Sequence, residues 1–309
     1  MPGKITTGME AELARQTVLH TAQAEAAALN TMYRETLGTF LSTPHAVPLP
    51  RAARAIYWLG RLRQWRAIDL NGGETLPSTN WLSLQLGVIE GLAGIHALAL
   101  HKEQWSGPIR RQVYERDMAL QIAMLLALDW RELAAFALES WFEADGELAG
   151  THPISGMAGM IVNIAGEALG VPVPPTTFQK ADAALAQTRE RWRHDDSTFT
   201  AAVLQLAERR VRQCRHDSVA KLYDFDHPVE QAIPVELLML MRLRGAKVIP
   251  PWLASHPVMQ HPAAALVGAG APAQSQRVTH FIERVTRLLP QYGGLSRALA
   301  QQVERLEAV

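Results

Sequence analysis

The stretch from Val113 to Gly150 constrains the fold most, because it has the periodicity of two consecutive helices separated at Asp129. On a helical wheel, the second helix gathers its carboxylates within an arc of about 80° and places its apolar side chains opposite. The carboxylates are those of Asp129, Glu132, Glu139, Glu143 and Glu147, and the apolar side includes Leu138, Trp141 and Phe142. We therefore expect this helix to bury one side and to expose a negatively charged stripe on the other.

The acidic stripe has two explanations. One charged face is what any amphipathic surface helix shows, so the stripe could simply be solvated. However, like charges on one helix repel each other, and a cationic partner would relieve that repulsion. The second explanation predicts a partner-binding surface made of Asp129, Glu132, Glu139, Glu143, Asp145 and Glu147.

The remaining chain also has helical patterns, and no series of alternating strands is evident. Gly87, Gly91 and Gly94 recur on one side of a predicted helix, where another helix could approach closely. The sequence therefore predicts an all-α fold, a multi-helix bundle of antiparallel hairpins without a significant β-sheet. The other expected helices span residues 8–41, 51–70, 77–105, 151–170, 178–194, 199–216, 234–245, 274–289 and 293–306.

The clearest linker is the proline-rich stretch of residues 171–175, Val-Pro-Val-Pro-Pro. It divides the chain into an N-terminal helical bundle with the acidic helix, residues 1–170, and a C-terminal helical part, residues 176–309. We expect the two parts to pack together as one unit across this linker.

Composition excludes several classes. The 30 basic residues balance the 30 acidic ones, so there is no general attraction to nucleic acid or to a membrane surface. Cys214 is the single cysteine, which excludes an internal disulfide and a four-cysteine zinc site. The N-terminus lacks the apolar segment of a signal peptide, and no uncharged run reaches the length of a spanning helix. These features predict a cytoplasmic protein that does not bind nucleic acid or membranes directly.

Two groups of arginines stand out. Arg51, Arg54, Arg61, Arg63 and Arg66 lie on one predicted helix and are expected to form a positive surface. A second group lies in the C-terminal part, where acidic neighbours and the lack of interleaved aromatics favour a solvated or internally salt-bridged surface over a nucleic-acid site. This second group consists of Arg189, Arg191, Arg193, Arg209, Arg210, Arg212 and Arg215.

The search for catalytic motifs is largely negative. No zinc-protease, nucleophile-elbow, phosphate-loop or dinucleotide pattern is present. The pairs His256-Pro257 and His261-Pro262 could bind a metal, but turn formation and capping by His explain them more simply. An all-helical enzyme would have to assemble its site from Glu90, His96, Glu139, Glu143 and His152, whose spacing selects no reaction. We therefore expect no catalysis, no metal and no cofactor.

The segment from Pro234 to Pro262 resembles the closing segment of helical immunity proteins, which protect bacteria from secreted antibacterial toxins. The resemblance rests on Glu236 in an apolar helix, on Arg242 and Arg244 after it, and on Trp252 and His256-Pro257 further along. It implies a cytoplasmic protein that binds one cognate toxin of a type VI or polymorphic secretion system and performs no chemistry.

A nuclease toxin presents a cationic groove to its substrate, and the acidic stripe could cover such a groove. An enzyme and an effector-binding chaperone or adaptor are the alternatives, and a homodimer is also compatible with the sequence.

Overall fold

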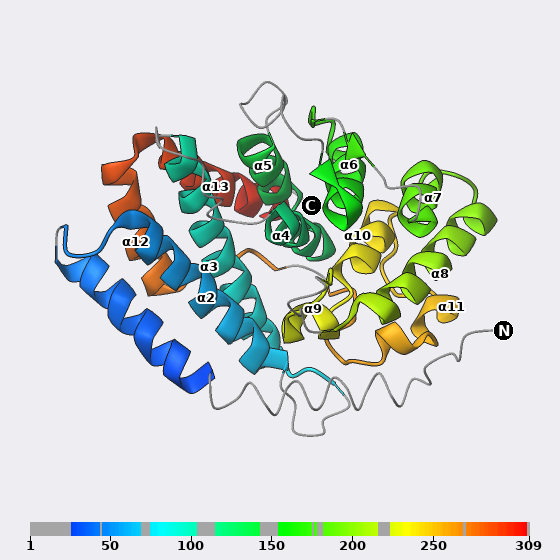
Figure 1. Cartoon of the computed structure of the whole chain (residues 1–309), viewed down its shortest axis with the longest axis horizontal. Coiled ribbons are helices and arrows are strands. Elements are labelled where there is room, and N and C mark those ends of the chain that lie inside the picture. The colour runs from blue at the N-terminus through cyan, green and yellow to red at the C-terminus, as the bar shows by residue number, and fades with distance from the viewer. Residues whose placement is uncertain are drawn as a thin grey trace.

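The computed structural model describes residues 26–43, 45–68, 75–103, 115–142, 154–174, 176–177, 182–215, 223–267 and 270–307. Helices dominate these residues, so the predicted all-α class is confirmed. Figure 1 shows α12 beside the N-terminal helices at one end of the molecule and α7, α8 and α11 at the other.

The observed elements follow the expected periodicity closely. Residues 26–42 are helical, and the main helices are α2 (Leu49–Ile68), α3 (Ser78–Glu103), α4 (Glu115–Ala127), α5 (Arg131–Trp141), α6 (Gly156–Leu169), α7 (Ala183–Arg191), α8 (Asp196–Gln213), α10 (Val235–Leu243), α12 (Gln276–Leu288) and α13 (Gly294–Glu307). Short elements complete the set: α9 (Pro228–Ala232), α11 (Pro251–Ala254), η1 (Pro257–Met259), η2 (Pro290–Gly293), and the two-residue strands β1 (Ile154–Ser155) and β2 (Thr176–Thr177), which pair in parallel.

Glycines allow α2 and α3 to pack at very short distance. A Cβ placed on Gly60 of α2 would lie 2.5 Å from the carbonyl oxygen of Gly87 on α3. A Cβ on Gly94 would lie 2.7 Å from the carbonyl oxygen of Ala53. The close helix approach predicted from the glycines of α3 is therefore confirmed, and Gly60 completes it on the facing helix.

The third helix is apolar along most of its length. From Ser78 to His101 it is long and apolar enough to cross a membrane by length and composition, although 78% of its most apolar window is buried inside the protein. Part of this cover comes from the C-terminal end of the chain, where α12 and η2 contact α3. The hydroxyl of Tyr292 in η2 donates a hydrogen bond of 2.8 Å to the carbonyl oxygen of Ala93.

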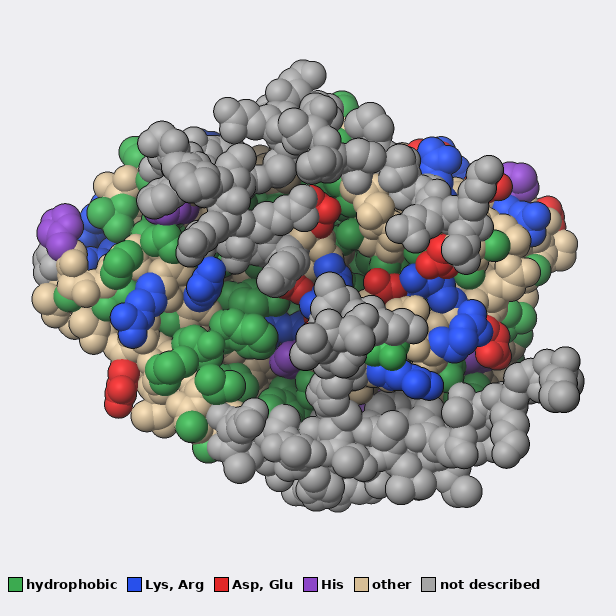
Figure 2. Space-filling view, viewed as in Figure 1, with side chains coloured by type: hydrophobic (Ala, Val, Ile, Leu, Met, Phe, Trp, Pro, Cys, Tyr) green, Lys and Arg blue, Asp and Glu red, His purple; other side chains and the backbone are tan. Residues whose placement is uncertain are grey.

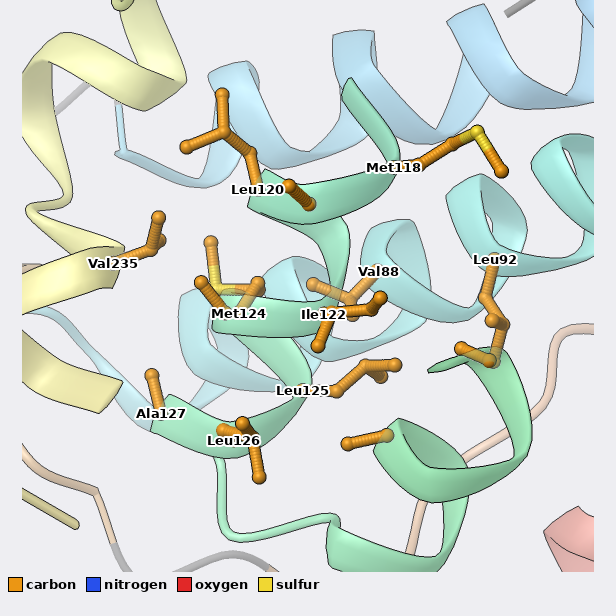
Figure 3. Close-up of a cluster of buried hydrophobic side chains, with 14 of the residues drawn as sticks. Val88, Leu92, Met118, Leu120, Ile122, Met124, Leu125, Leu126, Ala127 and Val235 are labelled. Carbon is orange, nitrogen blue, oxygen red and sulfur yellow. The ribbon is translucent and has the colours of Figure 1, made fainter. Parts of the chain in front are cut away.

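The fourth helix lies at the centre of the core. Every residue from Met118 to Ala127 is buried, as expected for a helix that is apolar on all sides. It contacts α3, α5, α6 and α10. Figure 3 shows Val88 of α3 and Val235 of α10 beside it. Helices from before and after the proline-rich stretch therefore contribute to the same buried core.

The proline-rich stretch packs against the helix that precedes it. Gly170 adopts a left-handed conformation, with φ of 71°, and caps α6. A Cβ on Gly166 would lie 2.7 Å from Cγ1 of Val173, so the chain turns back along the last turn of α6. The first residues of the proline-rich stretch therefore pack against the C-terminal turn of α6.

The prediction of a positive surface on α2 is wrong in part. Arg51, Arg54 and Arg66 are exposed, but Arg61 is buried and Arg63 is half-buried. Both inner arginines are paired with buried glutamates, which compensates their charge inside the protein.

Candidate functional site

The acidic helix keeps the predicted division into two sides over the residues that the structure describes. Leu138, Trp141 and Phe142 are buried, whereas Glu139 is exposed. The sequence predicted a helix from Asp129 to Gly150, but α5 begins at Arg131 and ends at Trp141. Asp129 precedes the helix in a left-handed turn conformation with φ of 60°, because the chain changes direction there between α4 and α5.

Two carboxylates of the predicted partner surface form ion pairs within the chain. Asp129 lies 3.2 Å from Arg131, and Glu132 lies 2.5 Å from Arg305 on α13. These side chains are between 32% and 47% exposed. Exposed pairs of this kind contribute about 0 to 1 kcal/mol, so a partner's cations could exchange with the internal ones at little cost.

Glu143, Asp145, Glu147 and His152 lie outside the described residues. Their place on the acidic surface, or in an enzyme site, stays a prediction.

On the face drawn in Figure 2, acidic and basic side chains lie intermixed on the right-hand side.

Glu90, a candidate for catalysis, is held in a buried ion pair. The guanidinium of Arg63 donates two hydrogen bonds, of 3.0 and 2.9 Å, to its carboxylate. The hydroxyl of Ser275 donates another, of 3.0 Å. These bonds occupy both oxygens of Glu90, and they join α2, α3 and the start of α12.

His96, the second catalytic candidate, sits among aromatic rings. Its ring centroid lies 4.8 Å from that of Phe136 and 5.0 Å from that of Tyr292, and its Nδ1 accepts a hydrogen bond of 3.4 Å from Trp141 Nε1. Burial lowers the pKa of His96 to about 4, so the imidazole is neutral at pH 7. Its distance of six residues from Glu90 places the two side chains on different faces of α3. Glu90 therefore takes part in a buried ion pair, and His96 packs separately among aromatic rings.

The His-Pro pairs act as caps. Nδ1 of His256 accepts a hydrogen bond of 3.3 Å from the backbone N–H of Val258, and Nδ1 of His261 accepts one of 3.0 Å from that of Ala263. His227 makes the same contact at the start of α9. Within the described residues, no three His, Cys, Asp or Glu side chains are grouped closely enough to hold a metal ion.

The segment from Pro234 to Pro262 is anchored by its charged residues. Both oxygens of Glu236 accept hydrogen bonds from Nη1 of Arg210, at 2.8 and 2.6 Å, and both side chains are buried. Arg242 donates to the backbone oxygens of Ala127 and Val267. Glu236 and Arg242 therefore hold this segment against α8 and α4.

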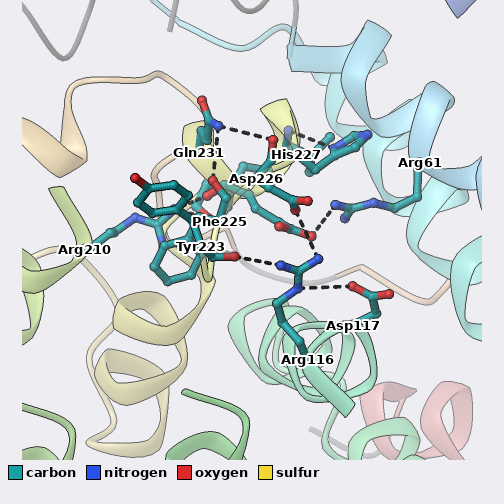
Figure 4. A network of polar contacts seen from close by, with 12 residues as sticks. Arg61, Arg116, Asp117, Arg210, Tyr223, Phe225, Asp226, His227 and Gln231 are labelled. Atoms are coloured by element: carbon teal, nitrogen blue, oxygen red, sulfur yellow. Dashed lines mark hydrogen bonds and ion pairs between the residues drawn. The ribbon is translucent and has the colours of Figure 1, made fainter. Parts of the chain in front are cut away.

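A polar network that the sequence analysis missed joins α2, α4 and α9 (Figure 4). Arg61 lies 2.5 Å from Glu230, and Arg116 pairs with Asp226 at 3.3 Å. Burial raises the pKa of both Asp117 and Glu230, although neighbouring arginines partly oppose that rise. A signal was available, because Arg61 falls on the same helical face as Trp58 and Trp65.

Comparisons with protein-family models, with curated proteins and with solved structures found no match.

Proposed function

We propose that this protein acts by binding a partner protein, and that it is an immunity protein that neutralises a cognate secreted toxin. The observation that carries this proposal is the contrast between two sets of carboxylates. Glu139 is exposed on α5, and Asp129 and Glu132 are partly exposed and form ion pairs at the surface, whereas Glu90 is buried in an ion pair. The surface carboxylates are the ones that a partner could reach.

The proposed partner is a basic nuclease toxin in the cytoplasm. Its cationic groove would contact the acidic surface of Asp129, Glu132, Glu139, Glu143, Asp145 and Glu147 and be blocked to substrate. Opposite charges would speed the encounter, and this attraction would weaken as salt is added.

The contacts that hold α5 against the rest of the protein support a role in partner binding. Leu138 and Trp141 fix the helix to the core, and the backbone N–H of Glu132 donates a hydrogen bond of 3.0 Å to the side chain of Gln302 on α13. A rigid helix loses little conformational entropy when a partner binds, so more of the interaction energy appears as affinity.

The test is growth rescue combined with binding. The chain is co-expressed with the toxin encoded by a neighbouring gene, and affinity is measured by calorimetry over a salt series. We expect Glu139→Lys to weaken both protection and affinity, because it reverses a charge at the contact. Glu190→Lys changes another exposed glutamate, on α7; it is the matched control and should leave both unchanged.

Circular dichroism checks that each variant is folded. Binding that is equally strong with Glu139→Lys would remove the acidic surface from the interface. Binding without growth rescue would favour the chaperone or adaptor alternative.

A further inference from the structure

We propose that a groove lined by Arg131, Arg193 and Arg244 binds a carboxylate-rich segment of another protein. The groove has a volume of about 700 Å³ and is open to solvent. Its walls come from the ends of α5, α6, α7, α8, α10 and α11, several of which gather at one end of the molecule (Figure 1). This volume lies within the range of known ligand sites. The inference does not depend on the toxin proposal.

The charge of the lining favours an anionic ligand. Among the described residues that line the groove, Arg131, Arg193 and Arg244 are basic and Asp196 is acidic. The guanidinium group presents several N–H donors in a plane and suits the bidentate recognition of carboxylates.

Aromatic rings orient two of these guanidinium groups. Arg193 lies over the ring of Trp192 at 4.6 Å, and Arg244 lies over the ring of Phe199 at 4.8 Å. Stacking fixes the plane of each guanidinium. Within that plane, Arg193 donates to the backbone oxygen of Glu167 and Arg244 donates to the backbone oxygen of His194.

The groove already holds one carboxylate. Asp196 pairs with Arg244 at 2.6 Å although the aspartate side chain is 97% exposed. Arg193 pairs with Glu167 at 3.1 Å, again between exposed groups. Such pairs are weak, so carboxylates of a partner could replace both.

Apart from Thr200, the rest of the lining is apolar, which narrows the class of ligand further. Met241, Leu243, Pro250 and Trp252 lie beside the arginines. An extended segment with carboxylates on either side of an apolar side chain would contact both kinds of surface. Nucleic acid fits less well, because guanidinium groups already cover one face of the two stacked rings and reduce the area for base stacking.

The first test compares two peptides on the full chain. Fluorescence anisotropy measures binding of a fluorescein-labelled Glu-Glu-Leu-Glu-Glu peptide and of a matched peptide with Gln in place of Glu. We expect the Gln peptide to bind at least about tenfold more weakly, since it loses the charge-assisted hydrogen bonds. Equal affinity for the two peptides would overturn the inference.

The second test changes the groove. Arg193→Gln removes an arginine whose side chain is 54% exposed, and we expect about a tenfold loss of affinity for the Glu peptide. Arg212→Gln removes an exposed charge on α8 outside the lining, and should change affinity by less than about twofold. Undiminished binding by the first variant, or an equal loss in both, contradicts a site in the groove.

Two further outcomes have distinct meanings. A single-stranded oligothymidine that binds more tightly than the Glu peptide and displaces it would overturn the inference in favour of a nucleic-acid site. Glu139→Lys should not weaken binding of the Glu peptide, so failure of the toxin proposal and failure of this inference can be told apart. If Arg193→Gln does not fold, the peptide comparison on the parent chain still decides.

Discussion

Replacing Gly60 by alanine would place a methyl group where α2 and α3 are in closest contact. The new Cβ would lie 2.5 Å from the oxygen of Gly87, 2.7 Å from the nitrogen of Gly91 and 2.9 Å from Cβ of Glu90. Two of these three atoms belong to the backbone of α3 and cannot move without the helix. The two helices would therefore have to separate.

Two opposing effects set the size of the change. Overpacking in a well-packed core costs up to about 3 kcal/mol. Alanine gains about 1 kcal/mol over glycine in a helix interior. We therefore expect Gly60→Ala to lower the free energy of unfolding by about 2 kcal/mol.

Gly38 provides the matched control. It lies within the helical residues 26–42, and a methyl group added to it would meet no described atom outside its own helix within 4 Å. Gly38→Ala should therefore raise the free energy of unfolding by about 0.5 to 1 kcal/mol. Urea unfolding followed by circular dichroism measures both. A Gly60→Ala variant that is as stable as the parent would refute the argument from close helix packing.

The buried pair and the buried histidine give two further predictions. Glu236→Leu should lower the free energy of unfolding by about 3 to 5 kcal/mol in urea titrations, because it leaves the guanidinium of Arg210 buried without its counter-charge. Adding Arg210→Met to that variant should recover most of the loss. The pKa of His96 is about 4 in the folded protein, against an ordinary value of 6.5. Above pH 6.5 the imidazole is neutral in both the folded and the unfolded chain, so it costs no stability. As the pH falls toward 4, the unfolded chain takes up the proton first, and the free energy of unfolding decreases. Urea unfolding at pH 7.5 and at pH 5 measures this decrease. Between the two pH values, the parent should lose about 2 kcal/mol more of its free energy of unfolding than His96→Gln does. An equal loss in both proteins would contradict the lowered pKa of His96.

Helical periodicity was sufficient to predict the fold class and most helices. The glycines of α3 also predicted a close helix contact, but they could not identify its partner. Gly60 is equally compatible with a turn or a flexible position, and only the folded chain places it against Gly87. Local patterns therefore predicted the kind of packing without predicting which helices meet.

The buried arginines were harder to predict. Residue type alone placed Arg61 and Arg210 on charged surfaces, since arginine is rarely buried. Their partners, Glu230 and Glu236, lie 169 and 26 residues away in the sequence. A charge can be buried only when its partner is present, and a single sequence does not reveal such pairs.

The candidate surface was predicted in part. The amphipathic pattern correctly placed Leu138 inside and Glu139 outside. It could not show that Asp129 lies in a turn before the helix or that Glu132 pairs with Arg305, because both depend on the path of the chain after each helix. Nor could it find the groove, whose lining comes from helix ends that are far apart in the sequence.

The contact between Tyr292 and Ala93 has a consequence for biosynthesis. The two residues are 199 positions apart, so a ribosome adding about 5 to 20 residues per second needs about 10 to 40 s to make the second after the first. During that interval α3 has emerged without the C-terminal helices that cover it. We expect the nascent chain to recruit holding chaperones at this stage, and truncation before η2 to leave an apolar helix open to aggregation.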